Sequence, residues 1–215
     1  MKITIICTDV SHPVYGYLLT WAKANSDKYN INLLASISEI KETGDILFLI
    51  SCSEIVRQAT RDLFKYTLVL HASDLPKGRG WSPHVWNILN GSNHLTLTLL
   101  NAEDSVDTGD IWRKVVIPLS GCELFDEINH KLFNAELKLM SWACENIDSV
   151  KPCKQTEFES TYLRKRTPED SEINIDASIR SQFNLLRVCD PNRFPAYFYI
   201  NGCKYNIRLE KVNEE

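Results

Sequence analysis

The chain has 215 residues, of which 44% are apolar and 24% are charged, as is usual for a globular protein. Its net charge of −4 argues against a nucleic-acid partner, because proteins that bind nucleic acids usually present a basic face. The first apolar run is too short for a signal-peptide core, and no run approaches the ~20 residues that a membrane-spanning helix needs. We therefore expect a cytoplasmic protein with no nucleic-acid and no membrane partner.

The expected elements alternate between strands and helices over the first two thirds of the chain. In chain order they are a strand at 3–7, a helix at 14–25, strands at 31–37 and 45–50, an amphipathic helix at 54–64, a strand at 66–70, a short helix at 83–89, and strands at 95–100 and 111–119. This alternation predicts an α/β fold with a mostly parallel, doubly wound sheet.

A long helix follows, because apolar residues recur every three or four positions between Leu124 and Trp142. The composition then changes near residue 150. We expect a main domain at 1–150, a surface linker at 151–177, and a small appendage with β structure at 178–215. Asn201-Gly202 separates two strand-like stretches of the appendage and predicts a hairpin. Exposed strands there offer a surface for a homodimer.

The seven cysteines form no Cys-x-x-Cys pair and are odd in number, which is typical of reduced thiols in a cytosolic protein. The five histidines show no zinc-ligand spacing with these cysteines. No metal site is therefore expected.

His71 and Asp107 are the candidate catalytic residues. His71 directly follows the apolar run 67–70, so it should lie at the carboxyl end of a buried strand, where open α/β sheets bind ligands. Asp107 follows a second apolar run, 95–100, and adjacent strands would bring the two side chains together. A carboxylate that orients an imidazole is an acid–base arrangement. The alternative is that each is structural, since Asp-Thr-Gly also favours a turn.

The segment His-Ala-Ser-Asp-Leu-Pro-Lys-Gly-Arg-Gly, residues 71–80, resembles the His-x-Ser-x-Leu-Pro-x-x-Arg-Gly segment of the formyltransferases that use 10-formyltetrahydrofolate. Pro83 and Trp86 continue the pattern, and Asp107-Thr-Gly-Asp is similar to the Asp-x-Gly loop of that family. The resemblance implies the Rossmann-like formyltransferase fold. It also implies that the donor pocket is lined by Ile55, Val56, Asp104 and Asp107.

The tail of the chain refines this resemblance. Residues 166–170 and 195–199 are similar to the tail of the subgroup that formylates amino sugars, and the length is closer to short sugar N-formyltransferases, including the pseudaminic-acid type, than to methionyl-tRNA members. The resemblance implies transfer of a formyl group from 10-formyltetrahydrofolate to a small-molecule amino sugar, nucleotide-linked and destined for a surface glycan.

The chemistry of formyl transfer suits these residues. An amine attacks the formyl carbon, negative charge develops on the oxygen, and a proton must leave the nitrogen. His71 can act as the base or, once protonated, donate to the oxygen, while Asp107 orients it.

Three further residues are candidates for substrate contacts. Ser11 and His12 precede a helix whose N-terminal amides could bind a phosphate, although a simple helix cap is the alternative. Trp81 could stack on a sugar ring, although a place in the core or the pocket wall is the alternative.

One position departs from the family pattern. The family carries Asn-x-His, with an amide that donates to the oxyanion, whereas this chain has Val69-Leu-His71. Losing one such donor costs about 10²–10³ in rate. Three alternatives therefore stay open: hydrolysis of the donor, formylation of another small amine such as a glycinamide nucleotide, and a non-catalytic module that binds folate or sugar.

Overall fold

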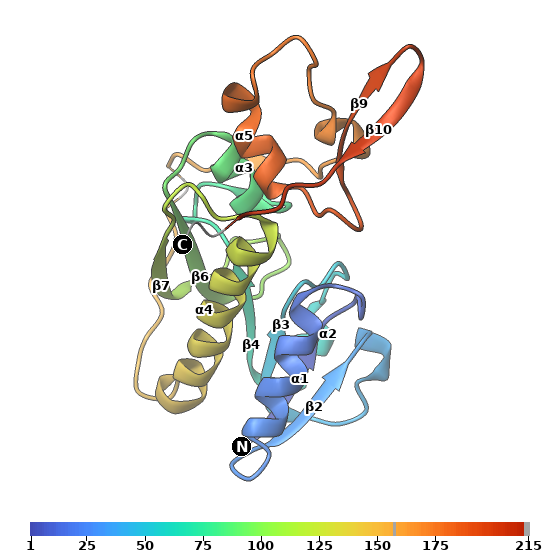
Figure 1. The fold of residues 1–215 in the computed structure, drawn as a ribbon. Helices are drawn as coiled ribbons and strands as arrows, with labels where there is room; N and C mark the ends of the chain where they lie inside the picture. The colour runs from blue at the N-terminus through green and yellow to red at the C-terminus, as the bar shows by residue number, and fades with distance from the viewer. Residues whose placement is uncertain (157, 213–215) are drawn as a thin grey trace.

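The computed structural model describes residues 1–156 and 158–212 and is built on a six-stranded mixed sheet with the strand order β2-β1-β3-β4-β6-β7 (Figure 1). The strands are β1 (Lys2–Ile6), β2 (Asn30–Leu34), β3 (Gly44–Leu49), β4 (Phe64–His71), β6 (His94–Asn101) and β7 (Ile111–Pro118). The first four run parallel, whereas β6 and β7 are antiparallel to their neighbours. The expected α/β fold with a mostly parallel sheet is confirmed.

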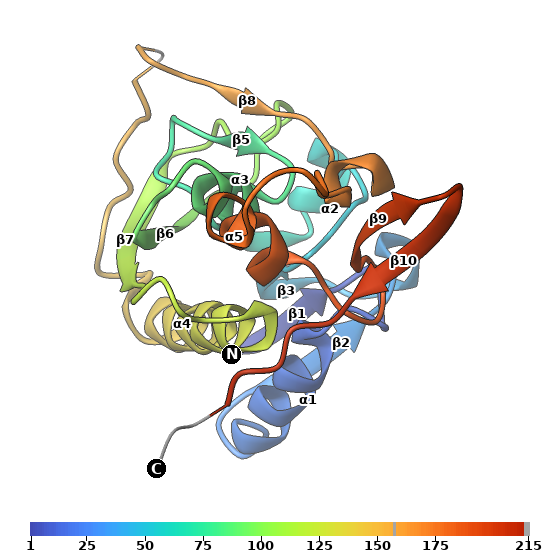
Figure 2. The ribbon, with the colours of Figure 1, turned by 45° about the horizontal axis from the view of Figure 1, so that its top comes forward.

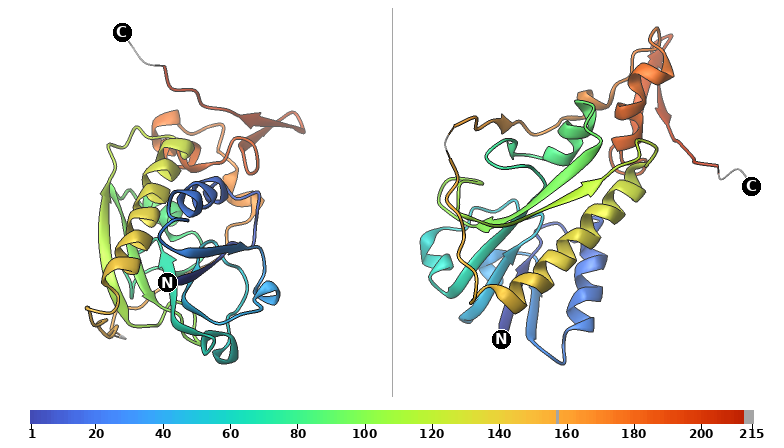
Figure 3. Two further views of the ribbon diagram at one scale, coloured as in Figure 1. Left: turned by 90° about the horizontal axis from the view of Figure 1, so that it is seen from below. Right: turned by 90° about the vertical axis from the view of Figure 1, so that its left-hand side faces the viewer.

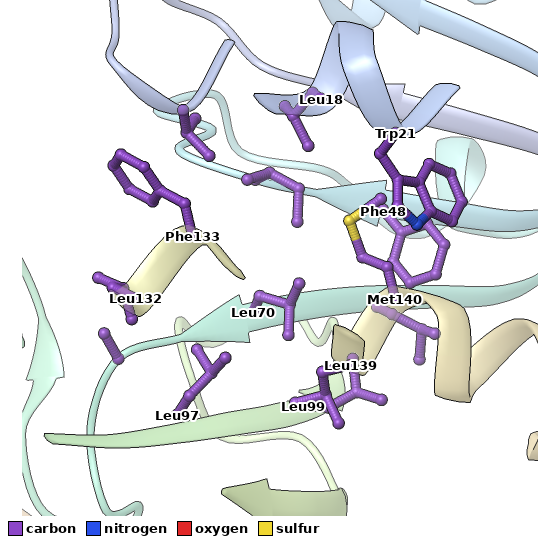
Figure 4. Packing of buried hydrophobic residues seen from close by; sticks show 14 of the residues in the cluster. Leu18, Trp21, Phe48, Leu70, Leu97, Leu99, Leu132, Phe133, Leu139 and Met140 are labelled. Atoms are coloured by element: carbon purple, nitrogen blue, oxygen red, sulfur yellow. The ribbon is translucent and has the colours of Figure 1, made fainter. Parts of the chain in front are cut away.

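One face of the sheet is covered by α1 (Val14–Ala24) and α4 (Phe125–Asn146), which lie next to each other (Figure 3). The predicted stripe of α4 faces the sheet, because Leu132 and Leu139 are 2% exposed. Figure 4 shows these leucines opposite Leu70 of β4, within one continuous apolar core. Burial of this stripe against the strands stabilises the long helix.

The second face of the sheet carries a smaller apolar cluster formed by Ile6, Leu47, Leu49, Val56 and Phe64. Strand β4 contributes to both faces, since side chains alternate along a strand. Leu68 and Leu70 belong to the α1/α4 core, whereas Val69 packs against the second cluster.

The predicted helix at 54–64 is wrong over most of its length. Only α2 (Gln58–Arg61) is helical. Phe64 already pairs with Gly44 in the β3–β4 ladder, which requires extended backbone, and Val56 is buried on the second face of the sheet. The apolar spacing of this segment reflects those two burials rather than one helical face.

The segment after residue 150 is more ordered than its composition indicates. Its short strand β8 (Tyr162–Leu163) pairs in parallel with β5 (Arg79–Gly80), which lies in the loop that follows His71 (Figure 2). A 3-10 turn, η2 (Pro168–Ser171), follows. The residues that were expected to form a surface linker therefore hydrogen-bond to the loop beside the candidate site.

The appendage consists of α5 (Ile179–Val188) and a hairpin of β9 (Ala196–Ile200) and β10 (Cys203–Ile207). Asn201 and Gly202 have φ values of 52° and 78°, as the tight turn of a two-residue hairpin requires. The predicted hairpin is confirmed. Helix α5 packs against α3 (Pro83–Leu89), a helix that the sequence also predicts. Among the described residues, no helix is both long and apolar enough to cross a membrane.

Candidate active site

His71 and Asp107 meet in a buried position. His71 is the last residue of β4, and its Nδ1 atom lies 3.4 Å from Oδ1 of Asp107. The two side chains are 8% and 6% exposed. The structure thus brings together the two residues that the sequence singled out.

The loop 102–110 delivers Asp107 to His71. Strand β6 runs antiparallel to β4 and ends at Asn101, opposite Leu68, so the chain must fold back along β4 to reach His71. The Asn101 amide donates to the Asp110 carbonyl and closes this loop at 2.9 Å. A Cβ atom at Gly109 would collide with the Asn101 carbonyl, which explains the glycine in Asp-Thr-Gly-Asp.

The loop 74–80 contacts both members of the pair. Nε2 of His71 lies 2.8 Å from the carbonyl oxygen of Gly78, and the Gly80 amide donates to Oδ2 of Asp107 at 2.9 Å. Gly80 has a φ of 97°, and a Cβ atom there would collide with the carbonyl of Leu163 in β8. The Gly-Arg-Gly sequence therefore allows one loop to hold both side chains and to pair with β8.

Both ring nitrogens of His71 face oxygen acceptors, Oδ1 of Asp107 and the Gly78 carbonyl. A neutral imidazole carries one N–H and can donate to one of these oxygens, whereas the protonated ring can donate to both. Nε2 must leave the Gly78 carbonyl before it can reach a substrate atom.

Val69 lies two residues before His71, on the same face of β4. It packs against the second apolar cluster together with Cys52 and Ala102. A valine side chain has no hydrogen-bond donor, so this position cannot stabilise a developing negative charge.

Two loops that carry the candidate donor-binding residues are tied together by Arg61. Its Nη1 atom donates to the Val56 carbonyl at 2.9 Å and to Oδ1 of Asp104 at 2.8 Å. Val56 is buried, whereas Ile55 is 65% exposed and Asp104 is largely exposed. Sequence reasoning missed Arg61, because an arginine within an apparent amphipathic helix carries no distinguishing signal.

Ser11 and His12 lie in the loop between β1 and α1, and neither provides a free helix N-terminus. The Ser11 amide and hydroxyl both donate to Asp9, while Nδ1 of His12 accepts from the Val14 amide at 3.2 Å. Nε2 of His12 lies 3.4 Å from the Ser51 hydroxyl at the end of β3. Burial, and then the charge of Arg193, lowers the pKa of His12.

Trp81 follows β5 and is 39% exposed, with Nζ of Lys165 positioned 4.7 Å from its ring centroid. His84 is the second residue of the helix that follows this loop. Burial, followed by the charges of His12, His71 and Arg166, lowers the pKa of His84 to about 4. The lowered pKa values favour the neutral forms of His12 and His84, so the cationic charge in this region comes from residues such as Lys165 and Arg166, which the sequence did not predict.

No family model matches the chain. The methionyl-tRNA formyltransferase of Rickettsia canadensis (strain McKiel) is 32% identical over 203 residues, which cover 94% of this chain and 62% of that protein. The chain thus spans less than two thirds of the length of the curated relatives it matches.

Solved structures of the same fold include a methionyl-tRNA formyltransferase from Clostridium thermocellum, with a TM-score of 0.82, 23% identity, and coverage of 99% of this chain and 94% of that one. A second is WlaRD, a sugar 3N-formyl transferase in the presence of dTDP and 5-N-formyl-THF, with a TM-score of 0.66, 19% identity, and coverage of 87% and 78%. The sequence match, at 32% identity over 94% of this chain, is therefore to the formyltransferase family, and the solved formyltransferases share its fold.

Proposed function

We propose that this protein transfers a formyl group from 10-formyltetrahydrofolate to the amino group of a nucleotide-linked amino sugar. The observation that carries the proposal is the buried His71–Asp107 pair, held by the loop 74–80 at the end of β4. Buried ionisable pairs that are positioned by surrounding hydrogen bonds are characteristic of catalytic sites.

The donor-binding residues would be Ile55, Val56, Asp104 and Asp107. Ile55 is exposed next to Val56 of the second apolar cluster, and Val106 is exposed in the loop that carries Asp104 and Asp107, so both would offer apolar contacts to a flat pterin ring. Arg61 fixes the spacing of the two loops that would form the walls. When bound, the donor supplies the activated formyl group, and the related sugar 3N-formyl transferase was solved with a formylated folate.

His71 would handle the proton and the developing negative charge. The attacking amine loses a proton as its new bond to carbon forms, and a neutral His71 can accept it. In its protonated form, His71 can donate from Nε2 to the oxygen on which charge develops once that nitrogen has left the Gly78 carbonyl. Asp107 would hold the ring orientation through Nδ1.

The acceptor side carries groups suited to a phosphorylated sugar. Arg166 would supply a cationic contact for phosphate, and His12 and His84, whose pKa values are lowered, would supply neutral ring nitrogens. Ser11 and Trp81 lie on loops at the same end of the sheet. The net charge of −4 favours a small acceptor over a large RNA. We also propose that two copies of the protein pair through the C-terminal hairpin. The proposed domains are a main domain at 1–150, a surface linker at 151–177 and an appendage at 178–215.

The test incubates the protein with 10-formyltetrahydrofolate and a panel of nucleotide-linked amino sugars, with glycinamide nucleotide and other small amines as further acceptors. Tetrahydrofolate release that requires an amino sugar supports the proposal. Release at the same rate without any acceptor would identify a hydrolase instead. Release with another amine alone would reassign the acceptor.

A second candidate is a non-catalytic module that binds folate or a sugar. Two observations favour it: Val69 supplies no donor, and Nε2 of His71 is hydrogen-bonded within its own loop. Binding of the donor by calorimetry, with no formyl transfer to any acceptor of the panel, would support this candidate.

A further inference from the structure

We propose that Gln155 is a positioning residue for Asp107, so that the segment around it forms part of the active site. This inference rests on the proposed function for its catalytic consequence. The placement of the Asp107 loop by Gln155 is supported by hydrogen bonds within the chain, independently of that function.

The side-chain amide of Gln155 joins the two loops that flank His71. Its Nε2 atom donates to the carbonyl oxygens of Asp107 at 2.9 Å and of Gly109 at 2.8 Å. Its Oε1 atom accepts from Nη2 of Arg79 at 3.1 Å, on the loop that also holds His71. Both N–H groups of one amide are therefore used by the loop that carries Asp107.

The backbone two residues before Gln155 is fixed independently. Cys153 and Ile111 exchange a pair of backbone hydrogen bonds, each 2.8 Å long. Gln155 thus projects from a segment that is anchored at the start of β7, directly after the Asp107 loop. An anchored side chain loses less conformational freedom when it forms its hydrogen bonds.

Asp107 depends on such support because its backbone is strained. Its φ of 57° lies in the left-handed region, which is unfavourable for a residue with a Cβ atom. Such a conformation persists where its surroundings hold it in place. The Gly80 amide holds the carboxylate of Asp107, and Gln155 holds its carbonyl.

This role requires the two N–H donors of a side-chain amide. A glutamate at position 155 would keep the length of the side chain and its contact with Arg79, but it has no N–H to donate. Its carboxylate would face the two carbonyl oxygens of Asp107 and Gly109. Both Gln155→Leu and Gln155→Glu therefore release the loop, by different physical routes.

Gln182 provides a matched control. Its side chain also bridges two backbone groups, since it accepts from the Asn174 amide at 2.7 Å and donates to the Asn174 carbonyl at 2.9 Å. It lies in α5, outside the loops that hold the pair. Gln182→Leu removes a comparable set of hydrogen bonds without touching the Asp107 loop.

The experiment measures two properties of the full chain and its variants. The first is kcat and the acceptor KM for formyl transfer. The second is the NMR spectrum of the His71 imidazole, in which the signal of Nδ1 reports its contact with Asp107. Circular dichroism and thermal unfolding establish that each variant is folded.

We expect Gln155→Leu and Gln155→Glu to lower kcat by roughly 10²-fold, the cost of misplacing a catalytic group by about 1 Å, with little change in KM. The Nδ1 signal of His71 should shift in both variants and stay unchanged in Gln182→Leu. Folded Gln155 variants with wild-type kcat and an unchanged His71 spectrum would overturn the proposal. If the wild-type protein formylates no acceptor, the proposed function fails, and the His71 spectrum still decides whether Gln155 positions Asp107.

Discussion

At the scale of single residues, Val69 occupies the position where, in the proposed reaction, a side-chain donor would stabilise the negative charge. It shares a face of β4 with His71, and it is only half buried. We expect Val69→Asn to raise kcat by about 10²-fold, because a side-chain oxyanion donor is typically worth 10²–10³ in rate. Steady-state formyl transfer checks this. Val69→Leu adds no donor and should show no gain, and a folded asparagine variant without a gain would refute the role given to this position.

Glu136 makes the stability of the protein depend on pH. Burial raises the pKa of this carboxyl from 4.5 to about 8, and its Oε2 atom has no hydrogen-bond partner among the described residues. Between these pH values the unfolded chain ionises Glu136 while the folded protein keeps it protonated. The unfolded state therefore binds fewer protons than the folded state in this range. As a result, the free energy of unfolding falls as the pH rises from 4.5 to about 8.

Glu136→Gln should remove this pH dependence, because a glutamine does not ionise. Urea unfolding at pH 4 and pH 8 measures the effect. The free energy of unfolding of the variant, relative to that of the wild type, should be larger at pH 8 than at pH 4. An equal difference at both pH values would show that Glu136 is not buried as a neutral acid.

The sequence predicts some of these residues and not others, for a physical reason. His71 directly follows a strongly apolar run, so its place at the end of a strand can be inferred locally, whereas Asp107 reaches it only through the returning loop 102–110. Gln155 and Arg61 are polar residues whose sequence neighbours show no regular apolar pattern that would single them out. Their contacts depend on where distant parts of the chain return, which local patterns do not encode.

At the scale of elements, the pairing of β8 with β5 holds the loop 74–80 in place. Thr161 contributes twice: its hydroxyl accepts from the Gly78 amide at 2.8 Å, and its carbonyl accepts from the Arg79 amide at 2.9 Å. The Gly78 carbonyl is the group that meets Nε2 of His71. The β8 segment is therefore connected to His71 through one residue of the loop.

Thr161→Val tests this connection because it removes the hydroxyl and keeps the shape of the side chain. We expect the Gly78 amide to exchange with solvent faster, and the protein to lose about 1 kcal/mol of stability, the usual contribution of one hydrogen bond. Amide hydrogen exchange and urea unfolding measure both effects. Thr60→Val, in α2, is the control for a general effect of losing a hydroxyl. Unchanged exchange at Gly78 would contradict the connection.

Element prediction succeeded where periodicity was strong and failed where it was weak. The stripe of α4 and the Asn201-Gly202 hairpin are local signals, and the structure confirms both. Strands of two residues, such as β5 and β8, are too short for any period, so their pairing could not be anticipated. The predicted helix at 54–64 failed because two separate burials imitated one helical face.

At the scale of the whole molecule, the fold is shared with solved formyltransferases and the sequence match is to that family, whereas the acceptor is a proposal. The α/β architecture followed from alternating elements, but the antiparallel direction of β6 did not, since the connection after β4 has no pattern that sets its direction. That direction is the reason that Asp107 reaches His71 through a returning loop instead of from a parallel strand end. This returning loop makes the His71–Asp107 pair possible, and the proposed reaction depends on that pair.

Mass spectrometry of the acceptor after incubation with 10-formyltetrahydrofolate tests the role of the His71–Asp107 pair, with the wild type compared with His71→Ala and Asp107→Asn. We expect an N-formylated amino sugar with the wild type, and a loss of about 10²-fold or more in its rate of formation with either variant. Equal rates for the wild type and a folded His71→Ala variant would contradict this role.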